Sequence, residues 1–146
     1  MAKPTTVSAA KLLILIGDGA TPEVFAAPCG LTSRGINFSK ETNDTQVPDC
    51  ADPDAPQWVE RVTTALSGTV SGSGVLAQEA LATWRTFFFS TESRNCRIRI
   101  DGGTGWGHWE GKFLCTTFNV TGENGEKVGV EIELQNDGEI TWVAAT

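Results

Sequence analysis

The sequence lacks most of the side-chain patterns on which catalytic and metal-binding sites depend. It has a single histidine, His108, and no serine or cysteine in an activated-nucleophile motif such as G-x-S-x-G. Its four cysteines include no C-x-x-C pair, so their spacing predicts no zinc site. We therefore expect no catalytic residue, no cofactor and no metal ion.

The cysteines are too few and too scattered for a disulfide scaffold. We interpret them as small buried thiols, and the alternative is one bridge between Cys29 and Cys50, which flank a polar segment. We interpret His108 as a turn or packing residue beside two tryptophans. A Cys–His pair with Cys96 or Cys115 is the catalytic alternative.

Long apolar runs are also missing. The run Leu12–Ile16 has five residues, shorter than the apolar segment of a signal peptide and far shorter than the roughly 20 residues that span a bilayer. It is followed by the turn signal Gly17-Asp18-Gly19, which favours a strand ending there. We expect the chain to be made and assembled in the cytoplasm without membrane insertion.

Positive charge is scarce, since 11 lysines and arginines face 18 acidic residues and the net charge is -7. Such a surface repels phosphates and disfavours a conventional DNA- or RNA-binding module. The chain has no tyrosine, but it has five Trp, seven Phe and 16 Gly. With many Val, Ile and Thr, this composition favours β structure, and 146 residues fit one domain, 1–146.

Hydrophobic patterning predicts strands along most of the chain. Turn signals separate the last four of them, and Asn124-Gly125 and Asp137-Gly138 are typical of hairpins. The segment Gln57–Thr64 is compatible with a helix or a strand. The predicted strands lie in Lys11–Ile16, Glu23–Glu41 (two or three short pieces), Leu66–Leu76, Cys96–Ile100, Trp109–Val120, Lys127–Leu134 and Glu139–Ala144.

One helix is predicted, at about residues 77–89. Its expected apolar stripe consists of Ala77, Leu81, Trp84 and Phe88. Phe87 and Phe89 cannot share that stripe, because consecutive helical residues lie about 100° apart. Either the helix ends there or these rings cover something outside the subunit. The predicted fold class is therefore mainly β, a β-sandwich or barrel with one flanking α-helix.

Two segments have no core of their own. Met1–Ala10 is small and polar and predicts an extended N-terminal arm. Thr42–Pro56 holds three Pro and four Asp and predicts a long polar loop. Its residues Asp49, Asp52 and Asp54 could hold calcium, but a solvated acidic loop is the better interpretation.

Several blocks of the sequence resemble the tail tube (major tail) proteins of long-tailed phages and gene transfer agents, over nearly the whole chain. The first block is Cys29–Phe38, followed by Glu41–Asp44 and Val47–Cys50. The second is Thr69–Gly74, which leads into the predicted helix, and the third is the closing segment Val130–Trp142. No short catalytic motif defines this family, so the resemblance transfers no individual site residue.

The resemblance implies a β-sandwich core flanked by a helix, and subunits that form hexameric rings stacked into a tube. Strands of all six subunits would join into one barrel around a channel for DNA, which passes without specific binding. A long loop and the terminal arms would contact the next ring, and we assign this role to the predicted loop with Asp49, Asp52, Asp54 and Trp58. Implied partners are tape-measure, tail terminator and distal tail proteins, in the tail of a virion or phage-like particle.

The candidate functional residues follow from combining the patterns with this resemblance. Phe87 and Phe89 are candidates for a subunit interface. Glu131 and Glu133 alternate with apolar residues and must face water, either in the lumen or on the outer wall. Glu41 and Asp44 are equally open lumen candidates.

Other functions remain as alternatives at this point. A terminator or connector would be another tail component with similar surfaces. A small β-barrel carrier for an apolar ligand would also have meandering strands and one helix. The carrier predicts a soluble monomer, whereas the tube predicts rings or filaments.

Overall fold

The computed structural model describes residues 3–4, 6–8, 11–17, 19, 24–28, 30–101 and 106–144. These residues form a mainly β fold with one helix, which confirms the predicted fold class. The elements are β1 (Leu12–Gly17), β2 (Phe25–Ala26), β3 (Leu31–Gln46), β4 (Val59–Val75), α1 (Gln78–Phe89), β5 (Arg94–Ile100), β6 (Gly107–Thr121), β7 (Gly129–Asn136) and β8 (Thr141–Ala144).

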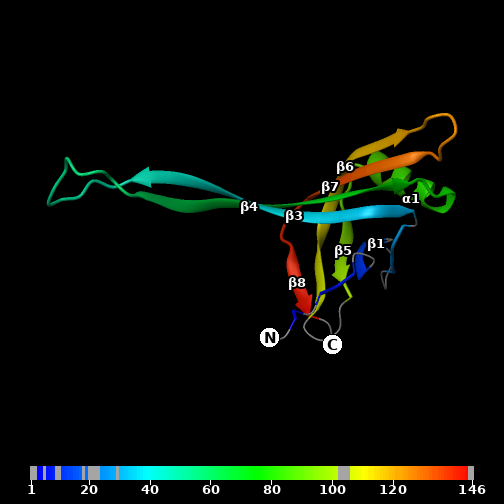
Figure 1. The fold of residues 1–146 in the computed structure, drawn as a ribbon, viewed down its shortest axis with the longest axis horizontal. Coiled ribbons are helices and arrows are strands. Elements are labelled where there is room, and N and C mark those ends of the chain that lie inside the picture. Colours follow the sequence, from blue (N-terminus) through cyan, green and yellow to red (C-terminus); the bar gives the residue numbers. More distant parts are fainter. Residues whose placement is uncertain are drawn as a thin grey trace.

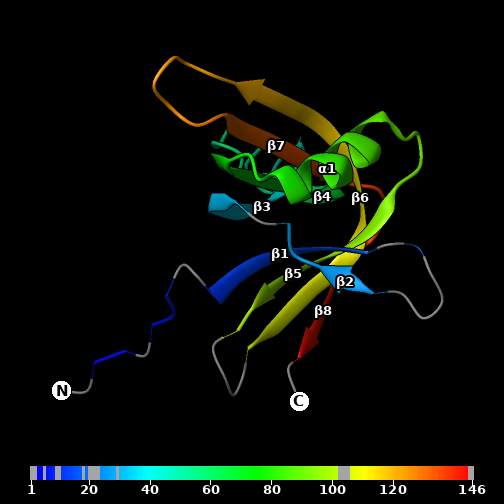
Figure 2. The ribbon, with the colours of Figure 1, turned by 90° about the vertical axis from the view of Figure 1, so that its right-hand side faces the viewer.

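All strand pairs are antiparallel, and the eight strands form one sheet in the order β2-β1-β5-β6-β7-β4-β3, with β8 paired to β6. Within the described ranges the sheet does not close into a barrel. The long strand β6 changes partners at Phe113, pairing with β5 before it and with β7 after it. A register shift between Cys115 and Thr117 bends the strand there. The β1-β5-β8 part therefore lies beneath the β3-β4-β7 part, and β6 runs through both (Figure 2).

The core lies between these two parts of the sheet and is closed by α1. Trp84, Phe87 and Phe113 are its largest fully buried side chains. Burial of such rings is the main favourable term in folding a domain of this size. The other members come from every long strand: Ile14, Ile16, Leu31, Val70, Cys96, Ile98, Cys115, Val130, Ile132 and Leu134, with Ala80 from the helix.

The helix forms where it was predicted, and the predicted stripe is partly right: Trp84 is buried, and Ala77 and Phe88 pack against the core. Its buried residues are Ala80, Trp84 and Phe87, while Leu81 is 36% exposed. Both stripes follow helical spacing and both contain Trp84, so the pattern alone could not separate them. The ring of Phe87 packs fully against the sheet. The buried face of the helix is therefore turned toward Ala80 and away from Leu81.

The predicted loop Thr42–Pro56 is right for residues 47–56, but residues 42–46 belong to a strand. β3 continues to Gln46 and β4 begins at Val59, so only residues 47–58 connect them. The undecided segment Gln57–Thr64 belongs mostly to β4. Together the two strands make a hairpin that projects far from the rest of the molecule (Figure 1). A two-stranded ribbon outside the core needs no apolar face, which is why its polar composition suggested a loop.

The predicted hairpin at Asp137-Gly138 is also wrong. β7 and β8 both pair with β6 in antiparallel fashion, so they run in the same direction along it. The connection is a local irregularity in which the Asp137 amide donates to the Lys112 carbonyl (2.7 Å). Asn136 fixes it by accepting a hydrogen bond from the Gly68 amide (3.0 Å) and donating one to the Gly138 carbonyl (2.9 Å). The turn at Asn124-Gly125, in contrast, does join a hairpin, β6 to β7.

The predicted arm Met1–Ala10 lies partly outside the described residues. Its described positions, 3–4 and 6–8, belong to no strand or helix and are largely exposed. No helix of the described part of the chain is long and apolar enough to span a membrane.

Two phenylalanines of α1 provide a matched test of this packing. Phe87 is 1% exposed and Phe89 is 74% exposed. We expect Phe87→Ala to lower the free energy of unfolding by about 3–5 kcal/mol, because it leaves a cavity in the core. The same change at Phe89 should cost about 0.5 kcal/mol or less. Chemical denaturation of the free subunit measures both, and equal losses would contradict this assignment of the helix faces.

Candidate functional site: an assembly surface

Strands β6, β7, β4 and β3 form a four-stranded layer with one polar face. Glu131 and Glu133 lie in the middle of this face, on β7. Val130, Ile132 and Leu134 point the other way and are buried in the core, as the predicted alternation requires. The cross-strand neighbours of the two glutamates carry hydroxyl or amide groups: Thr117, Asn119, Ser71 and Ser73.

The negative charge of the polar face is not neutralised by nearby basic side chains of the described residues. No lysine or arginine of the described residues forms an ion pair with Glu131 or Glu133. Among the described residues, the Glu133 carboxylate accepts a hydrogen bond from the Gln135 side-chain amide, at 3.5 Å. The face is slightly hollowed, and Ser33, Thr117 and the two glutamates are among the residues that line the hollow. A wide surface of hydroxyls and unpaired carboxylates binds phosphate poorly.

The layer has two free edges. β3 pairs only with β4, and residues 114–121 of β6 pair only with β7 among the residues described. Each edge therefore presents backbone N–H and C=O groups that a neighbouring strand could pair with. Because every pairing in the layer is antiparallel, β3 and β6 run in opposite directions. A second copy placed beside the first brings its β6 antiparallel to β3.

The hairpin tip, residues 47–58, carries the ring-stacking candidates. Asp49, Asp52, Asp54 and Trp58 are all exposed there, and Trp58 is 89% exposed. Further along β4, Val62 and Leu66 are also exposed. The described part of the subunit leaves these apolar side chains uncovered. The carboxylates form no group of metal ligands in the described part of the chain.

The lumen candidates Glu41 and Asp44 lie on opposite faces of the hairpin, since side chains alternate along β3. Glu41 shares the face of Ser33, which pairs with Ser73 of the polar layer. Asp44 instead forms an exposed ion pair with Arg61 on β4 (3.1 Å). Such a pair contributes little to stability.

The two interface candidates on α1 differ. Phe87 is wrong as an interface residue, because its ring is buried in the subunit core. Phe89 is exposed and makes an edge contact with Phe88, with the ring centroids 5.1 Å apart. Phe88 in turn lies 6.3 Å from the ring of Phe118 on β6. Phe89 thus extends an aromatic cluster of the core out to the surface.

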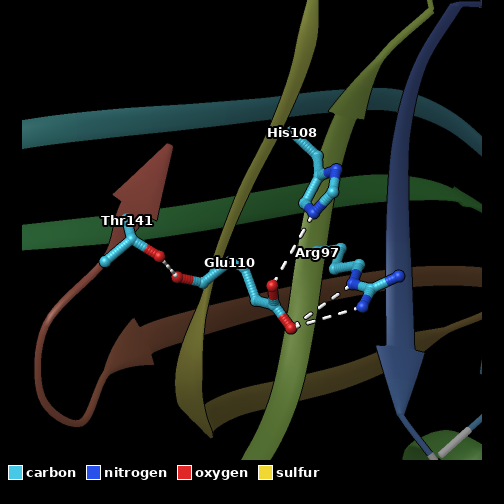
Figure 3. Close-up of polar contacts among 4 residues, drawn as sticks. All are labelled: Arg97, His108, Glu110 and Thr141. Carbon is cyan, nitrogen blue, oxygen red and sulfur yellow. Dashed lines mark hydrogen bonds and ion pairs between the residues drawn. The ribbon is translucent and has the colours of Figure 1, made fainter. Parts of the chain in front are cut away.

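His108 lies on the outward face of β6, within an ionic cluster (Figure 3). Its Nε2 is 3.7 Å from a carboxylate oxygen of Glu110. The other oxygen of Glu110 is 3.4 Å from Arg97, whose guanidinium also stacks 3.9 Å above the ring centre of Phe25. These contacts fix side chains on the sheet surface, in agreement with a packing histidine.

The alternative Cys–His pair is not assembled. Cys96 and Cys115 are buried in the core, on the opposite side of the sheet from His108. Cys50 is a free, exposed thiol at the hairpin tip, and Cys29 lies outside the described residues. β3 alone separates Cys50 from residue 31 by about 50 Å of extended chain, which speaks against a bridge between Cys50 and Cys29.

The sequence reasoning missed the length of the hairpin. The sequence holds one local signal for the paired strands, the opposite charges of Asp44 and Arg61. These residues are cross-strand partners, which can be recognised only when the register is known.

A sequence model of the family described as phage tail tube protein matches residues 6–142. A chain from the tail of an empty gene transfer agent particle with C6 symmetry is similar in fold, with a TM-score of 0.78, 22% identity, and coverage of 95% of this chain and 100% of that chain. The SPP1 tail tube has a TM-score of 0.68 at 8% identity, covering 96% and 80%. The tube-terminating cap of the anti-feeding prophage has 0.61 at 14% identity, covering 99% and 95%. No curated protein sequence matches.

The cysteines generate a prediction of reactivity and pH dependence. Burial raises the pKa of the Cys115 thiol from 9.0 to about 11. Alkylation of the native protein at mildly basic pH should therefore modify Cys50 and spare Cys115, as mass spectrometry would detect.

The raised pKa also means that the folded state favours the protonated thiol. Its contribution to stability is fully present below pH 9.0 and is lost as the pH rises through about 11. The loss should be smaller in Cys115→Ala, and an identical pH dependence in both proteins would contradict the assignment.

Proposed function

The chain belongs to the phage tail tube protein family, since the family's sequence model matches residues 6–142, and we propose that its copies join edge to edge into rings whose stack encloses a DNA channel. It is a structural tail tube protein. The gene transfer agent tail of similar fold has C6 symmetry, which supports six copies in each ring. No step of this function requires catalysis.

The observation that carries the proposal is the pair of free, opposite-running edges on one four-stranded layer. Joining β3 of one copy to residues 114–121 of β6 in the next gives an antiparallel ladder at every subunit boundary. Each copy then pairs its β3 edge with one neighbour and its β6 edge with the other, so the contact is heterologous. The ring closes when the rotation between successive copies completes a circle. A closed barrel leaves no exposed edge.

The same geometry decides which face lines the channel. The core side of the layer is covered by α1 and by the β1-β5-β8 part of the sheet (Figure 2). The helix α1 and the β1-β5-β8 part must lie outside the barrel, because inside it they would fill the lumen. The polar face with Glu131 and Glu133 is then the inner wall, and Glu41 lies on the same side. Negative charge on this wall repels DNA phosphates and lets DNA pass without binding.

The alternatives fit less well. A carrier for an apolar ligand needs an empty interior, whereas Trp84, Phe87 and Phe113 fill this one. A terminator would share the ring contacts but stop at one ring, and the projecting hairpin favours a subunit that contacts further copies. In a complete tail, a tape-measure protein, a terminator and a distal tail protein would be its partners. Electron microscopy of concentrated protein would distinguish tubes from single rings and from monomers.

Prolines in the β6 edge test the ring contact. Consecutive N–H groups of a strand point to opposite sides, so one of Asn119 and Val120 faces β7 and the other faces the free edge. We expect one of the variants Asn119→Pro and Val120→Pro to keep the melting temperature of the free subunit, because proline is tolerated where the N–H faces solvent. That variant should nevertheless form no rings. Normal tubes from the stable variant would contradict the pairing of edges.

Charge reversal on β7 tests the inner wall. We expect Glu131→Lys with Glu133→Lys to leave tubes intact but to impair DNA delivery, because lysines would hold passing phosphates in a salt-dependent manner. The matched control is Glu123→Lys with Glu126→Lys, the same change of charge near the β6–β7 turn. Delivery that is unimpaired by the first pair, in well-formed particles, would mean that other residues line the channel.

A further inference from the structure

Charge is divided unevenly between two parts of the molecule. The hairpin segment 40–61 has six carboxylates and two basic side chains, a net charge of -4. The outward face of β5 and β6 (Arg97, Arg99, His108, Glu110 and Lys112) has three basic side chains and one carboxylate. We call this second surface the basic face; Figure 3 shows its centre. In a chain with a net charge of -7, such a separation creates two surfaces of opposite potential.

The basic face carries unbalanced charge. Arg97 is neutralised by Glu110, at 3.4 Å. Arg99 and Lys112 are exposed, and neither has an ion pair among the residues that the structure describes. They stand four residues apart along the paired strands, a separation of about 13 Å. Asp101 follows β5 at the end of this face.

The hairpin tip carries the complementary groups. The carboxylates of Asp52 and Asp54 are exposed and have no ion pair in the described chain, while Asp49 accepts a hydrogen bond from the Ala51 amide (2.8 Å). Trp58 offers an exposed ring on which an arginine can stack. The tip points away from the body of its own subunit, so it cannot reach its own basic face (Figure 1).

We propose that the basic face is the docking site for the hairpin tip of a second copy, with Arg99 and Lys112 facing Asp52 and Asp54. This inference rests on the proposed tube, in which it names the contact between copies that are not edge-paired. A tip on one copy and a face on another make a heterologous contact, which propagates along an assembly. DNA is the competing ligand for a basic surface, but the strongly acidic remainder of the chain repels it.

A charge swap tests the contact. Arg99→Glu with Lys112→Glu should raise the protein concentration needed for tube formation at least about tenfold, because like charges then face each other. Asp52→Lys with Asp54→Lys should do the same. The combination of all four changes restores opposite charges and the native net charge, and should restore assembly. The matched control is Arg85→Glu with Lys127→Glu, which makes the same change of net charge at exposed sites elsewhere.

Crosslinking gives a second readout that does not depend on charge. Cys50 lies at the tip, and Thr141 on β8 is an exposed neighbour of Glu110 on the basic face. In tubes of Thr141→Cys, a short bismaleimide should link the two positions between copies and give a ladder of multimers on a denaturing gel. The ladder should vanish when Cys50→Ser is added.

The outcomes separate this inference from the proposed function. Wild-type protein that never forms tubes overturns both. Tubes of Thr141→Cys that give no crosslinks, or basic-face variants that assemble as well as the control, overturn the docking site and leave the tube standing. Loss of DNA binding with normal assembly in Arg99→Glu with Lys112→Glu would assign the face to nucleic acid and also overturn the proposal.

Discussion

Backbone groups along the two free edges of the β6-β7-β4-β3 layer need partners that the described subunit does not supply. β3 alone exposes such groups from Leu31 to Gln46. A long unprotected edge invites uncontrolled pairing, unless a specific neighbour takes it. The opposite directions of the two edges suit a second copy of the chain, which we propose as that neighbour. Once this pairing is accepted, the covered side of the layer must face outward and the polar side inward.

In the proposed assembly, the hairpin and the basic face have separate roles. The hairpin extends from the body as a two-stranded ribbon with Val62, Leu66 and Trp58 exposed, and the proposed assembly would bury these apolar groups. In the proposed assembly, its acidic tip and the basic face would add direction to the contact, because opposite charges fix register more than they add affinity. The core of Trp84 and Phe113 packs the two parts of the sheet that carry these surfaces against each other.

The sequence predicted those parts of the fold that depend on a one-sided core. The alternation of Val130, Ile132 and Leu134 with Glu131 and Glu133 was correct, because only one face of β7 is buried. The helix was predicted but its buried face only in part, since three consecutive phenylalanines fit two stripes. The full length of the hairpin escaped prediction because residues 42–46 and 59–63, in its projecting part, pair only with each other. Asp137-Gly138 signalled a turn without fixing the direction of the chain. Assembly surfaces depend on such pairing information, and the roles of Glu131, Glu133 and the tip residues in assembly stay predictions.

The most direct test of the central claim is a helical reconstruction of the assembled protein by cryo-electron microscopy, at a resolution that separates strands. We predict that β3 of each subunit pairs antiparallel with residues 114–121 of its neighbour's β6, with Glu131 and Glu133 facing the lumen. A tube in which these edges remain unpaired, or in which both glutamates lie on the outer wall, would contradict the account.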